Sequence, residues 1–250
     1  ARAMLADGLL SRFPVDVMYG LHNMPGLPAG HLHTRAGAIM AGEDDFIITI
    51  HGRGGHASRP QDLVDPLVVA AEIITALQTI VSRSVDPLTS AVVSCTEITT
   101  DGTRNAVPST VVISGDTRSF STRAQALLER RIRDVCENIS AAHGATCDVT
   151  YSNSFQPTIN DGRCATVATK VATDVVGADK TDGACAPVMA SEDFAVYATE
   201  VPACFVFIGN GTEAGRGGTP LHSHDYDFND DILQVGVEFY VALVHQELRA

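Results

Sequence analysis

Histidines stand at three places where glycine, proline or acidic residues interrupt the regular pattern of the chain. The sequence is GLHNMPGLP around His22, HGRGGHASRP around His56 and PLHSHDYDFND around His222 and His224. Imidazole nitrogens ligate transition metals and exchange protons near neutral pH. Metal binding or acid–base chemistry is therefore the first hypothesis for these stretches.

His22 follows a short apolar run and precedes a loop that holds Pro25 and Pro28. Two interpretations are open. It is a partly exposed histidine near a turn, or it is a metal ligand whose partners lie elsewhere in the sequence. His222 and His224 are the candidate partners, because catalytic metal sites take ligands from separate loops at one edge of a sheet.

The other two stretches also allow ordinary structural roles. The glycines before His56 permit a tight bend and the close approach of a ligand, but a plain turn with an incidental histidine has the same composition. The aspartates after His224 could hold the tautomer of a ligand histidine. Asn229 and Asp230 suit the start of the last helix, and we favour that capping role for them.

The composition is that of a globular protein with a large core. Of the 250 residues, 45% are hydrophobic and 19% are charged. No run approaches the length of apolar sequence that spans a bilayer, so we expect no membrane partner. The formal net charge is −13, and there is no basic stripe. Because phosphate binding needs clustered lysine and arginine, we expect no nucleic-acid partner.

The six cysteines are scattered singly, without a C-x-x-C pair: Cys95, Cys136, Cys147, Cys164, Cys185 and Cys204. Several of them lie in apolar runs. We interpret them as buried free thiols in a reducing environment, which predicts a cytoplasmic location rather than a disulfide framework.

The elements that must position the histidines fall into two patterns. Residues 43–154 follow the order β-α-β-β-α-β, which is typical of a ferredoxin-like antiparallel sheet with two helices on one face. The predicted elements are strand 45–52, helix 62–83, strand 89–99, strand 109–118, helix 122–143 and strand 145–152.

Residues 1–42 and 155–250 have a different, α/β pattern. The predicted elements are helix 2–10, strand 14–21, helix 161–177, a short helix capped by Ser191, the buried strand ACFVFIGN and a terminal helix from Asn229 or Asp230. The fold class is therefore α/β, with a compact unit inserted between two pieces of a partial α/β sheet domain.

The helix at 62–83 is apolar around much of its surface. Helical periodicity predicts a sheet-facing side made of Val64, Leu67, Val68, Ala71, Ile74 and Leu77. Val69, Ile73 and Ile80 then need another partner, which is either a second subunit or the α/β domain.

Seven motifs, taken in order, resemble those of the metal-dependent amidohydrolases. They are GLHNMPGLPAG, GRGGHASRPQDLVDPLVVAAEIITALQTIVSR, NAVPST, SGDTRSFS, SEDFAVY, FIGNG and PLHSHDYDFND. This family includes hippurate hydrolase, N-acyl-amino-acid deacylase and plant auxin-conjugate hydrolase, within the aminoacylase and carboxypeptidase superfamily. The resemblance runs through the whole chain with family-like spacing.

The resemblance implies a catalytic α/β domain with an inserted lid and dimerisation domain, and two divalent metal ions that share a water or hydroxide. His22 matches one family ligand. His222, and not His224, matches another. Zinc or manganese suits such a mixed histidine and carboxylate site, as do cobalt and nickel.

The resemblance also implies roles for four further residues. His56 matches a lid histidine that reaches into a neighbouring subunit's site and stabilises the oxyanion. Asn105 and Arg118 match lid residues that hold the carboxylate or carbonyl of the substrate. Glu192 matches a residue that lines the catalytic site.

The sequence departs from the family in one respect. The family's Cys-Gly-His-Asp stretch and its Glu-Glu pair, which supply the other metal ligands and the general base, do not occur here. The chain resembles a family member without its N-terminal third, so we expect the 250 residues alone to be inactive. A separate N-terminal fragment is a candidate partner.

The function predicted for the whole parent protein is the metal-dependent hydrolysis of N-acyl or N-aroyl amino acids or small peptides, by a homodimer formed through the lid. A non-catalytic dimerisation module and a small-molecule-binding module on the same fold are the alternatives. Chelator-sensitive activity on hippurate-like substrates distinguishes the enzyme from both.

Overall fold

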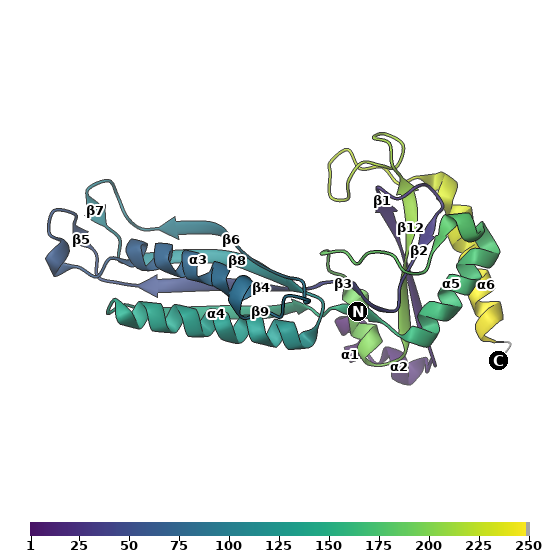
Figure 1. The fold of residues 1–250 in the computed structure, drawn as a ribbon, viewed down its shortest axis with the longest axis horizontal. Helices are drawn as coiled ribbons and strands as arrows, with labels where there is room; N and C mark the ends of the chain where they lie inside the picture. Colours follow the sequence, from purple (N-terminus) through teal and green to yellow (C-terminus); the bar gives the residue numbers. More distant parts are fainter. Residues whose placement is uncertain (249–250) are drawn as a thin grey trace. The chain divides into compact units, whose positions relative to one another are not determined.

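A computed structural model describes residues 1–248, which form two compact units (Figure 1). Unit 1 comprises residues 1–40, 158–188 and the chain from Glu192 onward, and unit 2 comprises residues 41–157 and 189–191. The unit boundaries lie at 40/41 and 157/158, where the sequence predicted 42/43 and 154/155. The short segment 189–191 joins unit 2 through its contacts, although the sequence placed it in the other domain.

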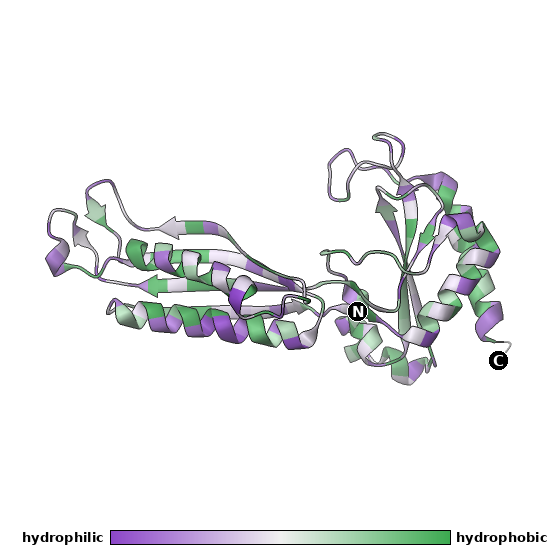
Figure 2. Cartoon of the chain, in the orientation of Figure 1, coloured by the Kyte–Doolittle hydropathy of each residue, from purple (hydrophilic) through white to green (hydrophobic). Residues whose placement is uncertain are grey.

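Unit 2 is built on a four-stranded sheet in the spatial order β6-β8-β4-β9. Its strands are β4 (Gly42–His51), β6 (Ala91–Thr100), β8 (Thr110–Ser119) and β9 (Thr146–Phe155). Every neighbouring pair is antiparallel. Buried and more exposed residues alternate along β4, so that one face of the strand is buried. The strand carries polar residues at its start and mostly apolar residues after Asp45 (Figure 2).

Two helices, α3 (Pro66–Arg83) and α4 (Thr122–Ala142), pack against this sheet. Asp65 caps α3 by accepting from the backbone N–H of Leu67, and Ser121 caps α4 by accepting from that of Ala124. Pro66 takes the first helical position, where its missing N–H costs nothing.

The predicted sheet-facing side of α3 was correct for Leu77, which is buried, and for Val64 and Ile74, which pack against the core, but it was wrong for Leu67 and Val68. Val69, Ile73 and Ile80 are buried in the core of unit 2, while Leu67 and Val68 are 40% and 54% exposed. Apolar residues lie around much of α3, so helical periodicity alone does not decide which side is buried. By length and composition alone α3 could also cross a membrane, but its buried side is part of this core, and core helices of soluble proteins meet the same criterion.

A two-stranded ladder stands beyond the main sheet of unit 2, formed by β5 (Gly55–His56) and β7 (Ala106–Val107). A Cβ atom at Gly54 would lie 2.5 Å from the carbonyl oxygen of Val107, so only glycine permits this close approach. The glycines therefore bring the His56 turn against the segment that contains Asn105.

Unit 1 has a second four-stranded sheet in the order β1-β12-β2-β11. Its strands are β1 (Met18–Pro25), β2 (Leu32–His33), β11 (Thr181–Asp182) and β12 (Ala203–Gly211). β1 and β12 run parallel, and every residue of β12 is buried. A small ladder joins β3 (Gly37–Met40) to β10 (Thr158–Asn160).

Helices α5 (Gly162–Val176) and α6 (Leu233–Glu247) pack with the β12 side chains in one core. Short helices complete the chain, namely η1 (Pro60–Asp62), η2 (Ala178–Lys180), η3 (Asp193–Thr199) and η4 (Asp230–Ile232). Each main helix and strand predicted from residue 45 onward has a counterpart, and the short strands were not predicted.

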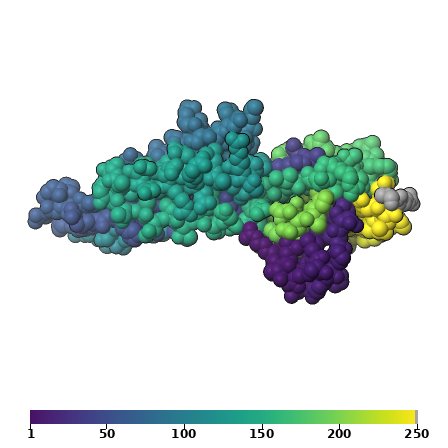
Figure 3. Space-filling view, turned by 90° about the horizontal axis from the view of Figure 1, so that it is seen from below, coloured from purple at the N-terminus to yellow at the C-terminus, as the bar shows by residue number. Residues whose placement is uncertain are grey.

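The N-terminal elements differ from the predicted helix 2–10 and strand 14–21. Two short helices, α1 (Arg2–Ala6) and α2 (Leu9–Arg12), precede β1, which begins at Met18. Gly8 breaks the helix with φ of 84°. The terminal ammonium pairs with Asp193, and Figure 3 shows this purple segment on the surface beside the green η3.

A buried carboxyl group lies at the start of β4. Asp44 is fully buried and accepts hydrogen bonds from Tyr151 at 3.1 Å and from Gln125 at 3.1 Å. Gln125 also donates to the carbonyl of Phe155 at 3.0 Å. The network joins β4, α4 and β9 near the place where both connecting segments leave unit 2. Burial raises the pKa of Asp44 to about 6, against the opposing effect of the two hydrogen bonds.

This pKa predicts how stability changes with pH. The folded protein holds the Asp44 proton more tightly than the unfolded chain, in which aspartate titrates near pH 4, so the contribution of Asp44 to stability falls as the pH rises from about 4 to about 6. Asp44→Asn should remove this loss. The difference in the free energy of unfolding between Asp44→Asn and the unsubstituted chain should rise by up to about 3 kcal/mol between pH 4 and 7, in favour of the variant.

Urea unfolding at several pH values measures the difference. Asp45→Asn is the matched control, because Asp45 is exposed and contacts Ser154. Parallel pH profiles for Asp44→Asn and the parent would contradict the assignment.

Candidate metal and substrate site

His22 lies in the second half of β1, three residues before its last residue, opposite Phe207 of the parallel strand β12. Its Nδ1 is 2.6 Å from the carbonyl oxygen of Asn23. A carbonyl oxygen only accepts, so Nδ1 carries the proton and the lone pair of Nε2 is free. A ligand histidine is in this state when its other nitrogen donates to a carbonyl. The arrangement fits the interpretation of His22 as a metal ligand.

His222 lies in the loop between β12 and η4. It is exposed and has φ of 66°, which makes it the sole non-glycine residue with positive φ among those described. A residue other than glycine adopts this conformation at a cost, and such strain is concentrated at functional sites. His224 is different, because its side chain is 92% exposed and its Nε2 lies 3.2 Å from Asp225. The two histidines of this loop thus differ in backbone conformation and in the contact that each side chain makes.

Two asparagines hold the His222 loop against the strands of unit 1. The side-chain amide of Asn23, next to His22, donates to the Tyr226 hydroxyl. At the end of β12, the fully buried Asn210 accepts from the backbone N–H of Asn229 at 3.0 Å and donates to the carbonyl of Gly217 at 2.8 Å. Asn229 also caps η4, as the sequence predicted. The loop is therefore fixed at both ends.

The described part of the chain does not hold a complete metal site. Within residues 1–248, no three histidine, cysteine, aspartate or glutamate side chains lie close enough together to bind one ion. The tautomer of His22 leaves Nε2 available to a metal, and His222 is the second candidate ligand. Two imidazoles are fewer ligands than a catalytic zinc site uses. The residues present fit a part of a metal centre.

Glu192 directly precedes η3 and caps it, since its carboxylate accepts from the backbone N–H of Phe194 at 3.3 Å. The prediction that Ser191 caps this helix was wrong. The Ser191 hydroxyl donates instead to the carboxylate of Glu43. A serine and a glutamate next to each other can both cap a helix, and the competing acceptor on β4 could not be predicted from the local sequence.

His56 and Asn105 lie together at the tip of unit 2. His56 pairs with Ala106 across the β5–β7 ladder, and the carbonyl of Asn105 accepts from the N–H of Ala57 at 3.1 Å. The N–H of Ser58 donates to Nδ1 of His56 at 3.2 Å. A backbone N–H only donates, so the ring proton is on Nε2, and exposed His56 presents an N–H donor. This tautomer is opposite to that of His22.

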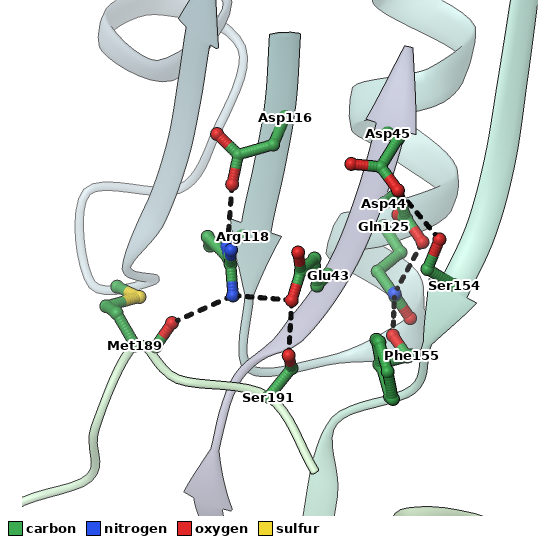
Figure 4. A network of polar contacts seen from close by, with 10 residues as sticks. All are labelled: Glu43, Asp44, Asp45, Asp116, Arg118, Gln125, Ser154, Phe155, Met189 and Ser191. Carbon is green, nitrogen blue, oxygen red and sulfur yellow. Dashed lines mark hydrogen bonds and ion pairs between the residues drawn. The ribbon is translucent and has the colours of Figure 1, made fainter. Parts of the chain in front are cut away.

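Arg118 lies at the other end of the sheet of unit 2, between two carboxylates (Figure 4). Its Nη1 is 2.8 Å from Glu43 and its Nε is 2.7 Å from Asp116. The three side chains are each less than a quarter exposed. Sequence analysis identified Arg118 but not its two partners. The acidic run that begins at Glu43 was visible, but the sheet register that sets Glu43 opposite Arg118 was not.

The length of β8 separates the two groups of predicted substrate-binding residues. At roughly 3.3 Å per residue, the steps from Thr110 to Arg118 span about 26 Å, and β7 lies beyond the Thr110 end (Figure 1). Arg118 and the pair of His56 and Asn105 therefore cannot contact one small substrate from the same copy of unit 2.

Comparison with known proteins gives one consistent family. The model of peptidase family M20/M25/M40 matches residues 1–246. Hippurate hydrolase of Campylobacter jejuni is 32% identical, over 100% of this chain and 64% of that enzyme. N-acetylcysteine deacetylase of Bacillus subtilis is 32% identical, over 97% of this chain and 61% of that enzyme.

Solved structures agree with these sequence matches. A dinuclear metal-binding peptidase of the M20 family from Bacillus subtilis has a TM-score of 0.78 at 26% identity, over 98% of this chain and 61% of that one. The mixed α/β fold is thus shared with that peptidase. The chain spans about three fifths of the length of the relatives it matches.

The two histidines should show opposite tautomers in solution. Long-range ¹H–¹⁵N spectra at a pH where both rings are neutral should place the proton of His22 on Nδ1 and that of His56 on Nε2, because each Nδ1 has a backbone partner of a different kind. His22→Ala and His56→Ala assign the signals. A His22 ring protonated on Nε2 would contradict its role as an Nε2 metal ligand.

Proposed function

The chain belongs to peptidase family M20/M25/M40, and on that premise we propose that its parent protein hydrolyses the amide bond of N-acyl or N-aroyl amino acids or small peptides with two divalent metal ions. The names of the matched enzymes support this substrate class, and the dinuclear peptidase supports the number of metals. The observation that carries the proposal is the free Nε2 of His22 on the parallel strand pair of β1 and β12.

We assign His22 and His222 as metal ligands, with zinc or manganese as the first candidates and cobalt or nickel as alternatives. When bound, the metals would polarise the scissile carbonyl and lower the pKa of a coordinated water. The carbonyl of Asn23 keeps the lone pair of His22 pointing away from its own backbone. Tyr226 and Asn210 hold the His222 loop in its strained conformation.

The lid residues act on the substrate in this proposal. The Nε2–H of His56 donates to the carbonyl oxygen of the scissile amide as negative charge develops on it. Asn105 and Arg118 bind the carboxylate or a carbonyl of the substrate, and the guanidinium suits a carboxylate because it offers parallel donors. Glu192 lines the site from the segment after Ser191.

We propose that unit 2 is a ferredoxin-like lid and that the protein is a homodimer formed through it. The strand order β6-β8-β4-β9 and the sequence of two helices and four strands support the lid assignment. The distance along β8 supports the dimer, because His56 and Asn105 of one subunit can meet Arg118 of another only at an interface between copies. A closed two-fold dimer would then hold two such sites.

The remaining metal ligands come, in this proposal, from a polypeptide segment that docks on unit 1 beside β1. In the described chain one edge of β1 pairs with β12, and no strand pairs with the other edge. Along that free edge, hollows of about 350 and 500 Å³ run between β1 and α6. Their α6 side includes Val237 and Val244, each 56% exposed.

Exposed apolar surface of this kind next to an unpaired strand edge marks an interaction site. The first hollow is lined by His22 itself, so a strand added here would bring its residues next to that ligand. The relatives have further sequence outside the match, and we propose that such sequence includes the segment that docks beside β1. Without such a segment, we propose that the 250 residues are inactive.

We propose a cytoplasmic location from the state of the cysteines. All six thiols are free, and four of them are buried. Burial raises the pKa of Cys136 and of Cys204 to about 12, so neither thiol is a reactive thiolate near neutral pH. Free structural thiols are typical of a reducing compartment.

The function is tested in a fusion of this chain to the part of Campylobacter jejuni hippurate hydrolase that lies outside the match. The fusion loaded with zinc or manganese should hydrolyse N-benzoylglycine, lose activity in chelator, and contain two metals per chain. His22→Ala and His222→Ala should each lower kcat by a factor of at least 100, since each removes a ligand, with metal content falling in parallel.

His224→Ala is the matched control and should retain activity and metal, because His224 is an exposed residue in the same loop. Full metal content in His22→Ala and His222→Ala would contradict the ligand assignment. The chain without the fused segment should be inactive under the same conditions.

The dimer is tested by complementation in that fusion. His56→Ala and Arg118→Ala should each be inactive, while co-expression of the two should restore about a quarter of the parent activity, because half of random dimers are mixed and each mixed dimer has one intact site. Hydrolysis of N-benzoylglycine measures the recovery. Failure to recover any activity would contradict a site shared between two subunits.

A further inference from the structure

Arg118 is not a free cation in this protein. Asp116, two residues earlier on the same strand, binds Nε, and Glu43 on the neighbouring strand binds Nη1 (Figure 4). Glu43 and Arg118 are direct cross-strand partners in the β4–β8 ladder. Because these side chains are mostly buried, the attraction between them is screened less than that of a surface pair.

The same two residues hold the segment 189–191. The Ser191 hydroxyl donates to the Glu43 carboxylate oxygen that also pairs with Arg118, and Nη1 of Arg118 donates to the carbonyl of Met189 at 3.4 Å. Figure 4 shows both contacts on one side of the sheet. Since Glu192 directly follows Ser191, the pair of Glu43 and Arg118 fixes the start of the segment that carries Glu192.

A ligand carboxylate cannot simply join this cluster. Nη2 of Arg118 has no hydrogen-bond partner among the described residues. Bidentate binding of a carboxylate needs Nη2 together with either Nη1 or Nε, and Glu43 and Asp116 occupy those two nitrogens. Adding a third carboxylate would surround one positive charge with three negative ones, whereas exchanging one carboxylate for another keeps two carboxylates in contact with Arg118.

Glu43 is the carboxylate that can leave. Asp116 is tied to the Arg118 strand, with its side chain on the same face two residues away. Glu43 has a second partner, the Ser191 hydroxyl, which can keep its hydrogen bond when the carboxylate moves away from Nη1. When Glu43 leaves, Nη1 can donate to a new acceptor beside Nη2. A carboxylate that approaches the end of the guanidinium can then accept from both nitrogens.

We propose that Glu43 occupies the place of the substrate carboxylate on Arg118, yields to it on binding, and so is a specificity-determining residue. Exchange changes the contact between Arg118 and the carbonyl of Met189, which makes the position of segment 189–191 depend on the presence of a carboxylate in the substrate. This inference rests on the proposed function, because it takes the ligand to be an N-acyl amino acid.

The methyl group of Met189 reports on this segment. The chain has five methionines, so a ¹³C-methyl-methionine spectrum is sparse, and Met189→Leu assigns the signal. Titration of the unsubstituted 250-residue chain with N-benzoylglycine should shift the Met189 signal. Titration with N-benzoylglycinamide, which lacks the carboxylate, should not shift it. This comparison needs no change in the cluster and no metal.

Glu43→Gln should move the unliganded Met189 signal toward its liganded position and tighten N-benzoylglycine binding about fivefold to tenfold, because a neutral amide competes less for Arg118. Asp45→Asn is the matched control, with the same loss of charge on the same strand but no contact with Arg118. It should bind as the parent does.

The outcomes separate this inference from the proposed function. If N-benzoylglycine binds but the Met189 signal stays in place and Glu43→Gln binds no more tightly, Glu43 does not exchange with the ligand, and the proposed function stands. If neither the parent nor Glu43→Gln binds N-benzoylglycine, both this inference and the proposed substrate class are overturned.

Discussion

The parallel pairing of β1 with β12 is the constraint on which the candidate metal site depends. Parallel strands end at the same edge of a sheet, so the segment after His22 and the loop that follows β12 begin at one edge, although they are far apart in the sequence. Burial of the whole of β12 fixes the pair in the core of unit 1. Asn23 then contacts Tyr226, and Asn210 contacts Asn229, which ties the His222 loop to the same edge. The ligand geometry is a consequence of this packing.

The sheet of unit 2 imposes a second constraint through its length. β8 connects the tip, with His56 and Asn105, to the base, with Arg118, and its extended backbone keeps these ends apart. In the proposed function, His56 donates to the developing oxyanion and Arg118 binds the carboxylate, but from one copy of unit 2 the two residues cannot serve the same small substrate. Two copies are needed to bring them together, so in this account assembly and catalysis depend on the same strand.

Much of this arrangement could be predicted from the sequence, because alternation and helical periodicity are local. The strands β4, β8 and β12 and the helices α4 and α5 followed from such patterns. The sheet-facing side of α3 followed only in part, because apolar residues lie around much of this helix and packing decides which of them are buried. The pairing of Glu43 with Arg118 depends on a register between strands far apart in sequence, and the tautomer of His22 depends on one backbone carbonyl. Neither the pairing nor the tautomer can be predicted from the residue types alone.

The position of the metal is the most direct test of the account. Crystals of the zinc-loaded fusion protein, with diffraction data recorded on both sides of the zinc absorption edge, would locate the ions by anomalous scattering. The account predicts anomalous peaks about 2.1 Å from Nε2 of His22 and from a ring nitrogen of His222. A metal bound to Nδ1 of His22, or peaks distant from both histidines, would contradict it.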